Sequence, residues 1–259
     1  MAQQVIDTTT DHGTYKGDPA KVAFEKANQN FAELYTMTPG GISGLKLTRT
    51  SVNVVTVGTG AAHIPGTSRI ASLTAPVSKS VSGPASSWLH GYIFESNGVT
   101  DVEWVTIAPA APYFGSARSK SGDSSRRYIG SIRTNASSQV VSFIHNPVNG
   151  NVRYLSDINA QTVLTGGKAT TTTEISLAQF VPLTSVVADI FAETGASDLA
   201  FISNPDAGAV ASSAILFFVR ASQQVAGSIA LSSNQRLSYL MAPATSGLSI
   251  LCSGYYFER

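Results

Sequence analysis

The chain contains 259 residues, of which 43% are hydrophobic and only 13% are charged. This composition excludes a disordered chain, and the length is sufficient to bury a sizeable core. The formal net charge of +1 offers no basic face for nucleic acid, and the single cysteine, Cys252, excludes an intrachain disulfide and a cysteine-based zinc cluster. We expect Cys252 to be a small apolar residue on a strand, and the low charge to suit strands that pack between subunits.

Residues 13–35, GTYKGDPAKVAFEKANQNFAELY, predict a helix. Asp18 is a good N-cap, and Pro19 suits the first helical position. Apolar side chains then recur at alternating spacings of four and three residues, so that one face of the helix carries Ala20, Phe24, Ala27, Phe31 and Leu34. A helix of this length is marginal by itself in water. We therefore expect the apolar stripe to pack on copies of itself or on another protein.

Residues 37–45 predict a linker, since Pro39 ends the helix and the glycines that follow disfavour regular structure. The pattern then changes to short stretches of β-branched and aromatic residues, separated by turn signals such as Asn97-Gly98. The strands expected before residue 156 lie within 45–57, 68–75, 88–95, 102–107, 126–134, 139–145 and 151–155. Their spacing indicates an antiparallel sandwich or barrel.

The pattern pauses at residues 156–161, and a second set of expected strands follows. These strands lie within 162–183, 185–193, 197–203, 213–221, 224–231, 235–242 and 248–259. About eight strands in about a hundred residues are typical of a jelly-roll-like sandwich. We therefore predict a mainly β protein with an N-terminal helix and two antiparallel β-sandwich (jelly-roll-like) domains. The predicted divisions are an N-terminal segment 1–36, a linker 37–45, a first β region 46–156 and a second β region 157–259.

Enzymatic sequence templates are missing. The chain has no G-x-S-x-G elbow, P-loop, G-x-G-x-x-G fingerprint or H-E-x-x-H pattern, and its four histidines have no ligand-like spacing. We expect no catalytic residue, cofactor site or metal site. Asp101 and Glu103, two residues apart on one strand face, are the nearest local carboxylate pair, which leaves glycan hydrolysis as an alternative.

The segment 115–134, GSARSKSGDSSRRYIGSIRT, is basic and contains a single acid, Asp123. Its cationic residues are Arg118, Lys120, Arg126, Arg127 and Arg133. Such a loop could engage anionic sugar or phosphate groups on a cell surface. A solvated hairpin or a contact between subunits is the interpretation that we favour, because loops commonly collect charge.

Aromatic residues form a second candidate feature, because exposed aromatic rings stack on sugar faces and anchor protein contacts. They gather in the first β region and at the end of the chain: Trp88, Tyr92, Trp104, Tyr113, Phe114, Tyr255, Tyr256 and Phe257. Tyr92 and Trp104 alternate with polar neighbours, so we expect them in the core. Adjacent Tyr255 and Tyr256 must point to opposite faces of a strand, and we expect one of them at an interface.

The predicted helix resembles a short motif near the N-terminus of many tailed-bacteriophage virion proteins, most of which are tail fibre or tail proteins. The residues that carry the resemblance are Gly17, Asp18, Ala23, Phe24, Lys26, Asn28, Asn30, Phe31, Glu33 and Leu34. The segment 108–134 is similar to a module of the same class of phage proteins. The motif covers about a tenth of the chain.

The resemblance implies a homotrimeric virion protein, assembled in the cytoplasm of a host bacterium. It would be a non-enzymatic tail fibre or baseplate-associated adsorption protein, docked on other tail, baseplate or capsid proteins, with no nucleic-acid partner and no membrane insertion. Its β domains would project and contribute to recognition of a host receptor such as a surface glycan. The implied anchoring residues are Asp18, Ala20, Phe24, Ala27, Asn28, Asn30, Phe31 and Leu34. The candidate recognition or interface residues are Arg118, Lys120, Arg126, Arg127, Tyr255 and Tyr256.

Three alternatives remain open at this point. A capsid decoration or head fibre protein would use the same helix on the head lattice. A glycan-binding or depolymerase tailspike would act through the β regions, with Asp101 and Glu103 as the residues to test. A free-standing bacterial lectin would leave the N-terminal helix without a role.

Overall fold

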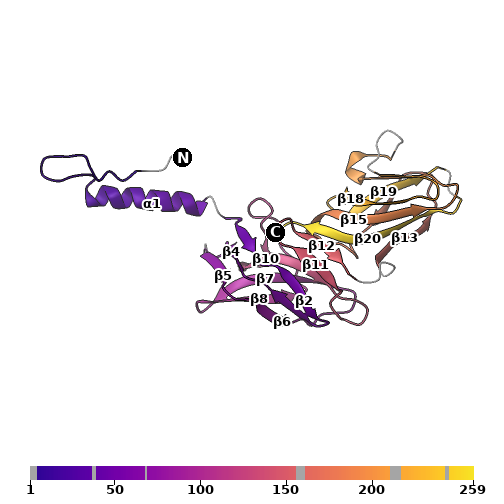
Figure 1. Ribbon diagram of the computed structural model, residues 1–259, viewed down its shortest axis with the longest axis horizontal. Coiled ribbons are helices and arrows are strands. Elements are labelled where there is room, and N and C mark those ends of the chain that lie inside the picture. The colour runs from indigo at the N-terminus through magenta and orange to yellow at the C-terminus, as the bar shows by residue number, and fades with distance from the viewer. Residues whose placement is uncertain (1–4, 37–38, 68, 156–160, 211–216, 243–244) are drawn as a thin grey trace.

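The computed structural model describes residues 5–36, 39–67, 69–155, 161–210, 217–242 and 245–259, without the side chains of residues 32–36. The protein is mainly β, with one α-helix, α1 (Ala20–Thr36), in the described part. Figure 1 shows α1 beyond the edge of the β-sheets, with the N-terminal segment folded back along it. Within these described ranges, no helix is both long and apolar enough to span a membrane.

The strands between the helix and residue 156 match the expected stretches and add several short ones. They are β1 (Ile42–Gly44), β2 (Leu47–Ser51), β3 (Val54–Val57), β4 (Gly60–Ile64), β5 (Arg69–Leu73), β6 (Val77–Ser80), β7 (Trp88–Ser96), β8 (Val99–Val105), β9 (Ser119–Lys120), β10 (Asp123–Arg133), β11 (Phe143–Asn146) and β12 (Asn151–Tyr154).

The strands after residue 160 also follow the expected stretches. They are β13 (Thr162–Gly167), β14 (Thr173–Ser176), β15 (Ser185–Thr194), β16 (Ala200–Ser203), β17 (Phe217–Val219), β18 (Gln224–Ala230), β19 (Arg236–Met241) and β20 (Leu248–Phe257). A short 3-10 helix, η2 (Pro205–Ala207), follows β16 and begins with Asn204, whose side chain accepts a hydrogen bond from the Asp206 amide.

The local turn signal between β7 and β8 is confirmed. Asn97 and Gly98 both have positive φ angles, 51° and 77°, and Ser96 pairs directly with Val99. Two consecutive left-handed residues between paired strands match the right-handed twist of a hairpin, which is why Asn-Gly is favoured at this position. The resulting hairpin pairs along the whole of β8.

Strand β1 forms inside the segment that the sequence predicts to be a linker. It pairs with β4 from Ile42 opposite Ala62 to Gly44 opposite Gly60, and both glycines have positive φ angles. A Cβ atom on Gly44 would collide with the Thr59 carbonyl, so only glycine permits this close approach. The short strand depends on backbone pairing with β4, which composition does not reveal.

The largest described sheet has nine strands and includes both β regions. Its order is β18-β15-β20-β12-β11-β2-β3-β6, and β13 also pairs with β20. The long strand β20 pairs with β15 along one edge and with β12 and then β13 along the other. The predicted division between residues 156 and 157 stays a prediction, and this sheet runs across it.

Three smaller sheets complete the described architecture. Their orders are β1-β4-β5, β8-β7-β10-β9 and β14-β19-β16-β17. The sheet β14-β19-β16-β17 packs against the nine-stranded sheet at two glycines. The Phe217 ring of β17 lies directly against Gly227 of β18, and Tyr239 of β19 lies directly against Gly167 of β13, so that neither glycine has room for a Cβ atom. Residues of this small sheet thus contact β18 and β13 of the nine-stranded sheet.

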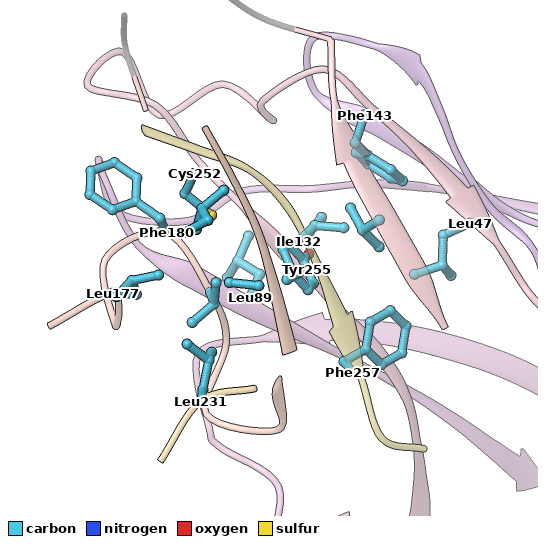
Figure 2. Packing of buried hydrophobic residues seen from close by; sticks show 14 of the residues in the cluster. Leu47, Leu89, Ile132, Phe143, Leu177, Phe180, Leu231, Cys252, Tyr255 and Phe257 are labelled. Atoms are coloured by element: carbon cyan, nitrogen blue, oxygen red, sulfur yellow. The ribbon is translucent and has the colours of Figure 1, made fainter. Parts of the chain in front are cut away.

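One cluster of buried hydrophobic residues joins the two regions. Figure 2 shows side chains of both regions in this cluster, among them Leu89 of the first region and Leu231 and Cys252 of the second. The expectation for Cys252 is confirmed, since it is buried on β20, and burial raises the pKa of its thiol to about 12. Tyr255 is also buried and donates a hydrogen bond to the Ser131 carbonyl at 3.0 Å.

Candidate functional site

The helix α1 is tied to the segment that precedes it. Its first backbone bond runs from the Ala23 amide to the Pro19 carbonyl at 3.0 Å. The Asp18 carboxylate accepts from the Asp7 amide at 2.9 Å and from Lys26 Nζ at 2.7 Å, and Lys26 also donates to the Val5 carbonyl at 3.0 Å. Lys26 and the Asp7 amide together lower the pKa of Asp18. Asp18 therefore links helix and leading segment, a role beyond the helix cap that the sequence predicts.

Gly17 explains why a glycine precedes Asp18. It is buried, its φ angle is +75°, and its amide donates to the Thr10 carbonyl at 2.7 Å. A Cβ atom at this position would lie 2.5 Å from the Asp7 carbonyl oxygen. Any other residue would therefore push the leading segment away from the start of the helix. Gly17, Asp18 and Lys26 act together as a clasp, which spacing alone did not suggest.

The apolar stripe of α1 is open to solvent in the single chain. Phe24 is 69% exposed and Phe31 is 59% exposed, seven residues apart on one face. Ala20 is also exposed and Ala27 is half-buried, whereas the side chain of Leu34 lies outside the described residues. Within the described part of the chain, the leading segment contacts the Lys26 side of the helix and leaves these two phenylalanines uncovered.

The two asparagines of the motif occupy different environments on α1. Asn28 is exposed, and Asn30 is half-buried and takes part in an interaction. The surface carried by the described anchoring residues thus combines two exposed phenylalanines with a neighbouring amide. This combination suits a protein contact, in which apolar area is removed from water and an amide supplies specificity.

Three of the four candidate cations in the basic segment pair with acids of the same chain. Lys120 lies 2.9 Å from a Glu103 oxygen, and the Arg126 Nε lies 3.5 Å from the same oxygen. Arg118 donates to Glu258 at 3.3 Å, next to the C-terminal residue. Arg126 also lies 3.9 Å from Asp123 of the same segment. The other two acids, Glu103 and Glu258, lie outside the segment, so the local sequence does not reveal them.

Arg127 is hydrogen-bonded to carbonyl groups, and no ion pair of the described residues includes it. Its side chain is fully buried, and its guanidinium donates to the carbonyls of Tyr128 at 2.9 Å, Arg118 at 3.2 Å and Gly40 at 3.2 Å. Burial lowers the pKa of this guanidinium from its ordinary value. Arg127 instead holds the start of the β body to the basic segment.

The C-terminal tyrosines point to opposite faces of β20, as the alternation requires. Tyr255 lies in the core and packs edge-on against Trp88, with ring centroids 5.6 Å apart. Tyr256 is half-buried on the other face. Tyr92 is buried and Trp104 is half-buried against the core, whereas Phe114 is 50% exposed.

The carboxylate pair on β8 is also paired with cations. Asp101 accepts from Lys79 at 2.7 Å. Burial raises the pKa of Asp101, but the hydrogen bonds from Lys79 and the Val102 amide together outweigh it, so that the pKa lies below its ordinary value. Glu103 accepts from Lys120. The two acids thus have separate cationic partners. No group of three potential metal-ligating side chains occurs within the described ranges.

The end of the chain forms a contact that the sequence did not suggest. Arg259 donates to the Gly44 carbonyl at 3.1 Å and also to the Pro147 carbonyl, and its own carbonyl accepts from Ser116 at 3.2 Å. Burial lowers its pKa to about 10. These bonds fix the end of β20 beside β1 and the first β region.

Comparison with known proteins adds no family to these observations. No protein-family model matches the chain. No curated protein matches it either.

Proposed function

We propose that this chain is a non-enzymatic structural protein of a tailed-bacteriophage virion, a homotrimeric tail fibre or baseplate-associated protein. It attaches to the particle through α1, and its β regions contribute to host-surface recognition. The observation that carries the proposal is the pair Phe24 and Phe31, both exposed on a helix that stands outside the β-sheets (Figure 1). Large apolar side chains gathered on one exposed face are typical of a surface that another protein covers.

The clasp of Gly17, Asp18 and Lys26 supports the same assignment. It presents the helix as a preformed unit, with the leading segment held on the side away from the two phenylalanines. A surface that is ordered before binding loses less conformational entropy when it docks. These clasp residues also belong to the stretch that resembles the N-terminal motif of phage virion proteins.

We propose that the second β region is a jelly roll and that the first is a separate sandwich. For the jelly roll, the supporting observation is the strand order, in which one layer reads β18-β15-β20-β13 and the other reads β14-β19-β16-β17. Each layer thus combines strands that are distant in the chain, as two Greek keys require. A jelly roll carried on a docked helix suits a projecting recognition domain.

Particle assembly in the host tests the proposal. Full-length protein with Phe24→Ser and Phe31→Ser should remain folded but should be absent from purified particles, because the docking face has lost its apolar area. Deletion of residues 1–36 should have the same effect, and it leaves Gly40, which contacts Arg127, in place. Wild-type incorporation of both variants would refute attachment through α1.

Copy number separates a tail protein from a head decoration protein. A few trimers per particle, measured by quantitative mass spectrometry, would support the tail assignment, whereas hundreds of copies would place the protein on the head. For the incorporation test of the Phe24→Ser, Phe31→Ser protein, the matched control is Lys21→Ala. Lys21 is exposed on the same helix but lies outside the apolar stripe, so this variant should join particles normally.

A further inference from the structure

A cavity of about 370 Å³ opens where the two β regions meet, and polar side chains line much of it. The polar groups belong to Ser86, Arg133, Asn135, Ser137, Gln161 and Gln179. They come from the loop before β7, the end of β10 and the loop after it, the residue that precedes β13 and the connection between β14 and β15. The volume lies at the small end of the range of ligand pockets, about 300–1,000 Å³.

Arg133 is the charged group of this cavity and has no counter-charge among the described residues. It is 8% exposed, its Nη1 donates to Gln161 Oε1 at 2.9 Å, and its guanidinium lies 4.8 Å from the centre of the Phe180 ring. Its Nε is buried and has no hydrogen-bond partner. The described ion pairs do not include Arg133.

This environment differs from that of every other cation in the basic segment. Arg118, Lys120 and Arg126 have carboxylate partners, and Arg127 is surrounded by three carbonyl oxygens. Arg133, by contrast, has the Gln161 amide oxygen and the Tyr154 hydroxyl as partners but no carboxylate among the described residues. Burying a guanidinium without an opposite charge is costly, and an anion in the adjoining cavity would offset that cost. The planar guanidinium also suits a two-pronged contact with a carboxylate or phosphate.

The walls of the cavity are held in place by hydrogen bonds. The Thr134 hydroxyl donates to the Pro84 and Ser87 carbonyls, on both sides of Ser86, at 2.6 and 3.2 Å. The Asn135 side-chain oxygen accepts from the Ser137 amide at 2.9 Å, which fixes the loop at the rim. A cavity with ordered walls requires little rearrangement before it binds.

A further hydrogen bond positions the wall that the second β region supplies. Trp88 Nε1 donates at 3.0 Å to the carbonyl of Ala178, next to Gln179. Exposed amides and hydroxyls at the rim, on Asn135, Ser137 and Gln179, are groups that pair with hydroxyls of a ligand. The deep cation and the polar rim therefore favour a ligand that has one anionic group and several hydroxyls.

We propose that this cavity binds the carboxylate or phosphate group of an anionic sugar or polyol unit, with Arg133 as the anion-binding residue. That the unit comes from a bacterial surface rests on the proposed function. The presence of an anion-binding site in this cavity does not. The proposal assigns host recognition to the junction of the β regions. It does not assign it to the paired cations Arg118, Lys120 and Arg126.

Titration of the full-length protein tests the site. Glucuronate and glycerol 3-phosphate are added separately, and glucose and glycerol serve as their neutral counterparts, with binding followed by calorimetry and protein-observed NMR. We expect saturable binding of at least one anion and none of the neutral compounds, and the preferred anion distinguishes a carboxylate from a phosphate ligand. Absence of saturable anion binding, or equal binding of the neutral compounds, would overturn the proposal.

Two variants act on the site in different ways. Arg133→Lys keeps the positive charge but loses the planar guanidinium that can donate two hydrogen bonds to one anion, so it should weaken anion binding by about tenfold or more. Ala136→Trp places a large ring at the opening of the cavity and should abolish anion binding. Because Ala136 is exposed, this variant should stay folded even if the Arg133→Lys protein does not fold. Arg236→Gln is the control, since Arg236 pairs with Glu174 outside the cavity. Unchanged affinity in the folded Ala136→Trp protein would refute the site.

The same variant separates this inference from the proposed function. Ala136→Trp protein should join particles normally, because α1 is untouched, but those particles should adsorb to host cells less well. Normal adsorption would refute a role of the cavity in recognition and would leave attachment through α1 intact. Conversely, normal incorporation of the Phe24→Ser, Phe31→Ser protein would refute the attachment and leave the anion titration unaffected.

Discussion

Lys26 Nζ lies 2.7 Å from the Asp18 carboxylate, eight residues before it in the chain, and so joins α1 to the segment that precedes it. We predict that Lys26→Ala releases this segment, because the Asp18 carboxylate and the Val5 carbonyl each lose a donor. Hydrogen exchange of the Asp7, Gly17 and Asp18 amides should become several-fold faster. Lys21→Ala should leave these amides unchanged, since Lys21 pairs with the exposed Glu25 at 3.8 Å and takes no part in the clasp. Equal exchange in both variants would show that the clasp does not depend on Lys26.

Phe24 and Phe31 should govern self-association of the chain. If α1 helices pack through this stripe, replacing both phenylalanines with serine removes the largest apolar groups that the described part of the stripe presents. Because burial of one such side chain contributes about 1.5–3 kcal/mol, the double variant should weaken association by more than about a hundredfold. Sedimentation equilibrium of the full-length protein measures the effect, and Glu25→Ser is the control on the same helix. A double variant that keeps the parent's mass at micromolar concentration would show that other surfaces hold the subunits together.

Asp198 should set the acid stability of the second β region. It is buried before β16, and its carboxylate accepts from the amides of Thr245 at 2.7 Å, Ser246 at 2.7 Å and Gly247 at 2.6 Å. The Thr245 hydroxyl and these amides lower its pKa to about 2. Since the folded state favours the ionised form, the stabilisation is present above the ordinary carboxyl pKa and is lost as the pH falls toward 2.

Asp198→Asn should therefore lower the melting temperature at pH 7, because the carboxylate that three amides share is lost. The difference from the parent protein should shrink as the pH falls below 4 and approach zero near pH 2. Thermal unfolding followed by circular dichroism across this range is the measurement. Asp206→Asn, at an exposed position of η2, should melt like the parent. If the difference in melting temperature did not vary with pH, the ionised form of Asp198 would not be what stabilises the loop of residues 245–247.

Gly130 should resist substitution because the side chains of Leu47 and Phe257 pack directly against it. Its φ angle is +151°, and a Cβ atom would lie 2.8 Å from Leu47 Cδ1 and 2.8 Å from Phe257 Cζ. Gly130→Ala should cost about 1–3 kcal/mol of unfolding free energy, the range expected of overpacking and backbone strain. Urea denaturation measures this cost. Gly58→Ala should be nearly neutral, since its Cβ would meet neighbours at 3.5 Å, and a similar loss in both variants would argue against overpacking.

Elements with a strong local pattern were predictable from the sequence. The β7–β8 hairpin follows from Asn97-Gly98 between two alternating stretches, and α1 follows from its apolar periodicity. Short strands such as β4 and β6 were not predicted, because their residues satisfy backbone hydrogen bonds with strands that lie elsewhere in the chain. Where β1 pairs with β4, Gly44 of β1 and Gly60 of β4 permit a close approach that no propensity scale rewards.

For the candidate sites, the sequence determined the exposed stripe of α1 and the concentration of cations in residues 115–134, because both are local patterns. Only the tertiary structure decided what those cations do. Glu258 neutralises Arg118 from the far end of the chain, carbonyl groups surround Arg127, and Arg133 borders the cavity at the junction of the β regions. The reason is physical: the free energy of a charge depends on the groups within a few ångströms in space, and here those groups are supplied by distant parts of the sequence.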